Sequence, residues 1–118
     1  MGGIGFSKAD RVASNLIAAG VRPGHIIGLW LPRGIHLLRM QAGIAKTGAA
    51  WLPFDAKVPV ERVVICLNDA YAFCLVTAQT YVAKLDDIDI PIFVAELLLL
   101  DTVQNVSLRR PAHMTQRM

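Results

Sequence analysis

The feature that most constrains the fold is an apolar run at residues 26–31, with the sequence Ile-Ile-Gly-Leu-Trp-Leu. The run shows no alternation of polar and apolar residues, and Pro23 and Gly24 form a typical turn just before it. A short apolar run that follows turn residues is typical of a strand buried on both faces. This run therefore predicts an inner strand of a parallel sheet, covered by helices on both sides.

The residues that follow complete a strand–helix–strand unit. Residues 35–47 predict a helix that shows solvent only a narrow polar stripe, and Gly48 is expected to end it with a left-handed backbone. Residues 49–54 predict a second buried strand, joined to the first by a right-handed crossover. The stripe of the helix is expected to contain His36, Arg39, Gly43 and Lys46.

Helices and strands alternate in the rest of the chain as well. Ser7 and Asp10 resemble a capping box at the start of a first helix that Gly20 ends. Pro91 predicts that the last strand lies at an edge of the sheet or begins at this proline. The alternation predicts an α/β fold, a doubly wound and mostly parallel sheet with flanking helices. The further helices are expected at residues 59–69 and 80–85, and the further strands at residues 72–77 and 90–94.

Composition and charge exclude several functional classes. The chain is 54% hydrophobic and only 18% charged, against about 25% charged residues in a typical soluble domain. Such a composition suggests a part of something larger, or a chain with an obligate partner. The net charge of +3 comes from three arginines in residues 102–118, so residues 1–101 are neutral and a nucleic-acid-binding body is not expected.

The sequence also carries expectations about location. No apolar run approaches the roughly 18–20 residues of a membrane span, and residues 1–7 lack the basic and apolar regions of a signal peptide. We therefore expect a cytoplasmic protein. Cys66 and Cys74 do not have the spacing of a metal knuckle or a redox pair, and we expect buried, reduced thiols.

Motifs that bind phosphate are incomplete. Residues 3–5 give half of a dinucleotide-binding fingerprint, but Lys8 stands where its third glycine belongs. Lys46 and Thr47 resemble the end of a phosphate loop, but they close a helix, where the dipole repels phosphate. Lys46 is instead expected to stabilise the negative end of that dipole. We expect no catalytic, cofactor-binding or metal-binding residue in this chain.

A family resemblance rests chiefly on residues 45–55, with the sequence Ala-Lys-Thr-Gly-Ala-Ala-Trp-Leu-Pro-Phe-Asp. They resemble the second core motif of adenylate-forming (AMP-binding) enzymes, in particular the adenylation domains of nonribosomal peptide synthetases, which reads Leu-Lys-Ala-Gly-x-Ala-Tyr-Leu-Pro-Ile-Asp in outline. Residues 58–62 resemble the Tyr-Pro-Ala-Glu-Arg that follows. The matching residues are Lys46, Gly48, Ala50, Leu52, Pro53, Asp55, Pro59, Glu61 and Arg62. The departures are Ala45, Thr47, Trp51, Phe54, Ala56 and Val58.

Flanking segments extend this likeness over residues 9–77. Residues 21–29 resemble the family's Val-x-x-Gly-Asp-x-Val turn and strand, with His25 in place of Asp. The resemblance implies that the matching residues are framework. Pro53 would end a strand, Asp55 would bond turn amides, and Trp51 would fill space beside the helices.

The resemblance also implies a function for the complete enzyme. Such an enzyme joins an amino acid to AMP from Mg-ATP, releases pyrophosphate and passes the acyl group to a carrier protein. The family's phosphate loop, adenine and ribose contacts and catalytic lysine come later in its sequence. Residues 1–101 are thus expected to be a partial N-terminal subdomain that does not catalyse the reaction alone. Residues 102–118 are expected to be a basic tail, a truncated linker toward the phosphate loop.

Two alternatives remain open from the sequence. In the first alternative, the chain is a stand-alone α/β binding module that holds a ligand at the carboxyl ends of its strands, near residues 32–34 or 54–55. In the second alternative, the chain is a non-functional gene remnant. A monodisperse monomer that unfolds cooperatively favours the binding module, whereas poor solubility favours a part of a larger enzyme.

Overall fold

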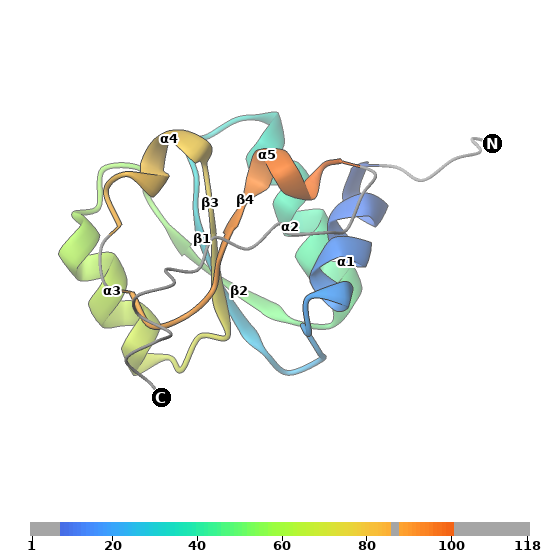
Figure 1. Cartoon of the computed structure of the whole chain (residues 1–118), viewed down its shortest axis with the longest axis horizontal. Coiled ribbons are helices and arrows are strands. Elements are labelled where there is room, and N and C mark those ends of the chain that lie inside the picture. Colours follow the sequence, from blue (N-terminus) through green and yellow to red (C-terminus); the bar gives the residue numbers. More distant parts are fainter. Residues whose placement is uncertain (1–7, 86–87, 101–118) are drawn as a thin grey trace.

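The computed structural model describes residues 8–85 and 88–100, and these form one four-stranded parallel sheet covered by helices (Figure 1). The strand order is β2-β1-β3-β4. This architecture confirms the predicted α/β fold. The strands are β1 (Ile26–Trp30), β2 (Ala50–Phe54), β3 (Cys74–Thr77) and β4 (Ile92–Val94). The helices are α1 (Lys8–Ala18), α2 (Ile35–Thr47), α3 (Val60–Asp69), α4 (Gln79–Val82) and α5 (Ala95–Leu98).

The helices divide between the two faces of the sheet, as in a doubly wound fold. Figure 1 shows α1, α2 and α5 on one side of the strands and α3 and α4 on the other. β1 alternates between the two cores that result. Ile27 and Leu29 pack with Leu16 and Met40 on the α1–α2 side, whereas Trp30 packs with the α3 side. Burial of β1 on both faces confirms the reading of the apolar run.

The second strand is less buried than expected. Ala50, Trp51 and Pro53 of β2 are exposed, because β2 pairs only with β1 in the described sheet and forms its edge. The prediction of a buried strand was therefore wrong. Trp51 is 37% exposed at this edge.

Pro53 has a physical reason for its place at this edge. The Ala50 N–H donates to the His25 carbonyl at 2.9 Å, so alternate residues of β2 face β1 and the backbone of Trp51 and Pro53 faces outward. Pro53 has no N–H and cannot donate to an added strand, which protects the edge from unwanted pairing. It lies inside β2, which ends one residue later at Phe54, so it does not end the strand as expected.

The stripe predicted for α2 was wrong at Gly43, although Lys46 is exposed as expected. Gly43 is buried against Val12 of α1, while Ile35 and Leu38, which lie outside the predicted stripe, are exposed. The polar residues were misleading because His36 and Arg39 lie half-buried beside the exposed face. Gly48 has the left-handed backbone expected of it, with φ of 85° and its N–H bonded to the Ala45 carbonyl at 3.1 Å.

Differences elsewhere concern the ends of elements. β3 begins at Cys74 rather than residue 72, and α4 covers Gln79–Val82 rather than residues 80–85. The short helix α5 was not predicted at all. β4 is an edge strand in the described sheet and Pro91 precedes it, as Pro91 predicted. The expected Ser7 cap and the basic tail lie outside the described residues.

Both cysteines are free thiols, and one of them is less buried than expected. Cys74 is completely buried in β3, and burial raises the pKa of its thiol far above the usual range. Cys66 on α3 is only half-buried, which corrects the expectation of two buried thiols. Cys66 lies on a helix whose outer side reaches solvent, since Ile65 is also exposed.

Candidate functional site

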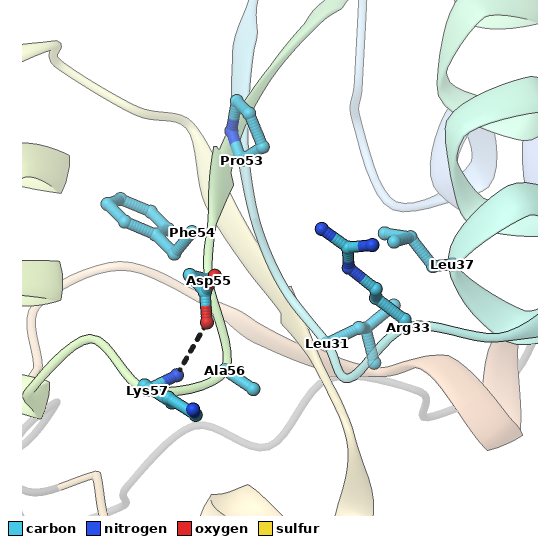
Figure 2. Close-up of a pocket in the computed structure, with 8 residues that line it drawn as sticks. All are labelled: Leu31, Arg33, Leu37, Pro53, Phe54, Asp55, Ala56 and Lys57. Carbon is cyan, nitrogen blue, oxygen red and sulfur yellow. Dashed lines mark hydrogen bonds between the residues drawn. The ribbon is translucent and has the colours of Figure 1, made fainter.

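A pocket of about 570 Å³ lies at the carboxyl ends of β1 and β2 (Figure 2). The two strands end together because their parallel register pairs Trp30 with Phe54. The pocket therefore joins the two segments that the sequence offered as alternative ligand sites, near residues 32–34 and residues 54–55. Its lining residues are Leu31, Arg33, Leu37, Pro53, Phe54, Asp55, Ala56 and Lys57.

The loop after β2 is held by Asp55. Its Oδ1 accepts a hydrogen bond from the Lys57 backbone N–H at 3.0 Å, and its carbonyl accepts one from the Val58 N–H at 3.0 Å. These bonds form a turn in which the side chain of Asp55 replaces a backbone acceptor. The carbonyl of Pro59 then accepts the N–H groups of Arg62 and Val63 in the first turns of α3. Asp55 thus bonds a turn amide, the role that the resemblance implied.

The opposite side of the pocket comes from the loop between β1 and α2. Figure 2 shows Arg33 reaching from this loop into the space between Leu37 and β2. Arg33, Lys57 and Asp55 are exposed, and no salt bridge joins Arg33 to Asp55 in the described part of the chain. The rim thus carries two cations and one carboxylate over an apolar floor. Such a surface suits an anionic group attached to an apolar body.

A second pocket of about 280 Å³ lies between the carboxyl ends of β1 and β3, where the crossovers turn to opposite faces of the sheet. Arg33 and His36 line it from one side, and Thr80 and Glu96 from the other. The Glu96 Oε1 accepts the N–H of Gln79 at 3.0 Å and so holds the start of α4. Sequence reasoning missed Glu96 because α5 was not predicted.

Side chains that could ligate a metal ion are dispersed in the described part of the chain. Within residues 8–85 and 88–100, no group of three His, Cys, Asp or Glu residues is placed to hold a metal ion. His25 is committed to the turn before β1, where its Nδ1 accepts the Arg22 N–H at 2.9 Å and its ring stacks on Phe73 at 4.2 Å.

The matching motif residues are spread over α2, β2 and α3, and only Pro53 and Asp55 line the first pocket. Lys46 in the last turn of α2 pairs with Asp10 of α1 at 3.1 Å, where it also lies near the negative end of the helix dipole. Leu52 pairs with Gly28 across the sheet. Glu61 and Arg62 lie exposed in the first turn of α3.

Comparison with known proteins shows the family. The family model described as AMP-binding enzyme matches residues 6–113, nearly the whole chain. The chain is 46% identical over 83 residues to the Delta-poly-L-ornithine synthetase of Acinetobacter baumannii and 36% identical over 104 residues to a dimodular nonribosomal peptide synthase of Bacillus subtilis. These matches cover 70% and 87% of this chain. The chain belongs to the AMP-binding enzyme family.

Solved structures agree with the sequence comparisons. The nonribosomal peptide synthetase FmoA3, in a form bound to α-methyl-L-serine-AMP, superposes with a TM-score of 0.74 at 27% identity over 87% of this chain. The O-succinylbenzoate coenzyme A synthetase of B. subtilis, in complex with ATP and magnesium, shares the fold with a TM-score of 0.74 at 16% identity, over 86% of this chain.

The chain corresponds to a small part of these relatives. It spans 6% of the A. baumannii synthetase and 4% of the B. subtilis synthase. It spans 12% of the FmoA3 chain and 28% of the coenzyme A synthetase chain. Among residues 8–85 and 88–100, no helix is long and apolar enough to cross a membrane.

Proposed function

We propose that this chain is the framework part of an adenylation domain of the nonribosomal peptide synthetase type. The single observation that carries this proposal is the 46% identity to the A. baumannii synthetase over 83 residues. The complete enzyme would activate an amino acid with Mg-ATP, release pyrophosphate and transfer the acyl group to a carrier protein. These residues would support the enzyme's other parts without touching the reacting atoms.

The geometry of the motif residues supports a framework role. Asp55 bonds a turn amide, Gly48 makes the left-handed exit of α2, and Lys46 pairs with Asp10. Each of these side chains or backbones has a local structural task. Adenylation depends largely on positioning and on stabilising charge at the phosphates, and the described residues offer no phosphate-binding loop for either.

This proposal has a test in two parts. The purified chain of 118 residues is expected to show no amino-acid-dependent ATP–pyrophosphate exchange, and exchange by the chain alone would contradict the framework role. The second part uses a hybrid, defined as the A. baumannii synthetase with its 83 matched residues replaced by those of this chain. The hybrid is expected to retain exchange with the parent enzyme's own amino acid.

The first pocket favours a second candidate function, that of a stand-alone binding module. Arg33 and Lys57 stand over the apolar Leu31, Leu37 and Pro53 there, which suits a small amphipathic anion. Calorimetry with short-chain carboxylates, comparing the chain with its Arg33→Ala variant, tests this candidate. Saturable binding that the variant loses would support it, and absence of heat would exclude it for this ligand class.

A further inference from the structure

The outer side of α2 carries an apolar stripe, with the exposed Lys46 beside it. Ile35 is 56% exposed and Leu38 is 61% exposed, and Ala42 and Ala45 follow them as exposed residues. These four residues recur at i, i+3, i+7 and i+10, so they share one face of the helix. We call Ile35, Leu38, Ala42 and Ala45 the α2 stripe.

The opposite side of α2 is already buried. Met40 and Ile44 are completely buried in the core shared with α1 and the sheet, and Gly43 lies against Val12. α2 is thus apolar on two opposite sides. Arg39, Gln41 and Lys46 lie between these two sides, and burial of both sides would place α2 between two packed layers.

The comparison with α3 shows that the α2 stripe is unusual within this chain. Ile65 of α3 is 55% exposed, about as much as Ile35. Its exposed neighbours on α3 include Glu61, Arg62 and Asn68, so the outer side of that helix is polar overall. A single apolar side chain among charged residues is common on protein surfaces, whereas a contiguous uncharged stripe marks a contact.

We propose that the α2 stripe is the surface on which the rest of the adenylation domain packs. This inference rests on the proposed function and identifies the face that the rest of the domain covers. We infer what covers the stripe from the lengths of the two molecules, because the chain corresponds to only 28% of a coenzyme A synthetase chain of the same fold. Most of such a molecule therefore lies outside these residues. The stripe has no charge, so an apolar surface fits it and a nucleic acid or acidic peptide does not.

Hydroxyl-radical footprinting with mass spectrometry tests the proposal in two molecules, the chain of 118 residues and the hybrid. In the isolated chain, Ile35, Leu38 and Ile65 are expected to be oxidised readily, because all three are exposed. In the hybrid, Ile35 and Leu38 are expected to become protected, while Ile65 remains reactive and serves as the matched control. Equal oxidation of Leu38 in the two molecules would overturn the proposal.

Substitutions give an independent readout. Leu38→Asp places a charge on the stripe, so it is expected to leave the melting temperature of the isolated chain nearly unchanged but to lower that of the hybrid by about 5 °C or more. Ile65→Asp is expected to have little effect on either molecule. Similar effects of the two substitutions in the hybrid would contradict a docking role for the stripe.

The outcomes separate this inference from the proposed function. A hybrid that exchanges ATP and pyrophosphate while Ile35 and Leu38 stay reactive overturns the docking surface alone. A folded hybrid without exchange overturns the proposed function and removes the basis of this inference. A third outcome is that Leu38 becomes protected in the isolated chain as the protein concentration rises but is not protected in the hybrid. That outcome would assign the stripe to self-association and overturn the proposal.

Discussion

Gly43 of α2 lies directly against Val12 of α1. A Cβ atom at Gly43 would lie 2.6 Å from the Cβ of Val12 and 3.1 Å from the carbonyl oxygen of Ala9, closer than side chains pack. The two helices therefore approach each other closely at this glycine. This contact buries Val12 completely, and it places Gly43 on the inner face of α2, opposite the stripe of exposed apolar residues.

Gly43→Ala is expected to destabilise the chain by up to about 2 kcal/mol, measured by urea denaturation. Alanine gains about 1 kcal/mol of helix propensity over glycine, but overpacking costs about 1–3 kcal/mol, and the contact with backbone at Ala9 leaves little room to relax. In a Val12→Ala background the cost should be smaller, because the nearest atom, the Cγ1 of Val12, is gone while the Cβ at 2.6 Å remains. An equal cost in the two backgrounds would show that the contact with the Cγ1 of Val12 is not the cause.

Asn15 ties α1 to the end of α5. It is buried, and its Nδ2 donates to the Leu98 carbonyl at 2.7 Å and to the Leu100 carbonyl at 3.3 Å. Asn15→Ala leaves these carbonyls without that donor and is expected to cost about 1–3 kcal/mol in the free energy of unfolding. Ser14→Ala, at an exposed position of the same helix, is the control and should cost less than about 0.5 kcal/mol. Equal effects would contradict the bridging role.

The two cysteines are expected to differ in reactivity. Burial raises the pKa of the Cys74 thiol, so it should not react with Ellman's reagent in the folded chain, whereas the half-buried Cys66 should react. Both thiols should react in denaturant. Rapid reaction of two thiols in the native chain would show that Cys74 is accessible.

The same thiol predicts a loss of stability at alkaline pH. Below 9.0, the ordinary cysteine value, Cys74 is protonated in both the folded and the unfolded state. Above it the unfolded chain loses the proton and the folded chain keeps it, so the free energy of unfolding falls as pH rises. Urea denaturation at pH 8 and pH 10 measures this effect, and Cys74→Ala should reduce the dependence on pH. An unchanged dependence in that variant would assign the effect to other groups.

The sequence predicted much of the fold because its strongest signals are local. The apolar run at residues 26–31, the helix at residues 35–47 and Gly48 at its end all have causes within a few residues. Tertiary context decided the rest. Nothing local distinguishes the edge strand β2 from a buried one. Gly43 has the spacing of a polar stripe in the sequence, and only the packing of α1 against α2 shows that it is buried.

The candidate site was predicted in part for a similar reason. Residues 32–34 and 54–55 were expected at strand ends, and parallel pairing of β1 and β2 brings them to one pocket. The second pocket needs Glu96, which follows the edge strand β4 in a helix of only four residues. A helix of this length shows almost no periodic pattern of apolar residues in the sequence. Its contribution to the pocket was therefore not predicted.

The measurement that tests the central claim most directly is ATP–pyrophosphate exchange by the hybrid, in which this chain's residues replace the 83 matched residues of the A. baumannii synthetase. The parent synthetase sets the reference rate, and circular dichroism verifies that the hybrid is folded. If these residues are the framework of an adenylation domain, the hybrid exchanges pyrophosphate with the parent's own amino acid, while the chain alone does not. A folded hybrid without exchange would contradict the claim.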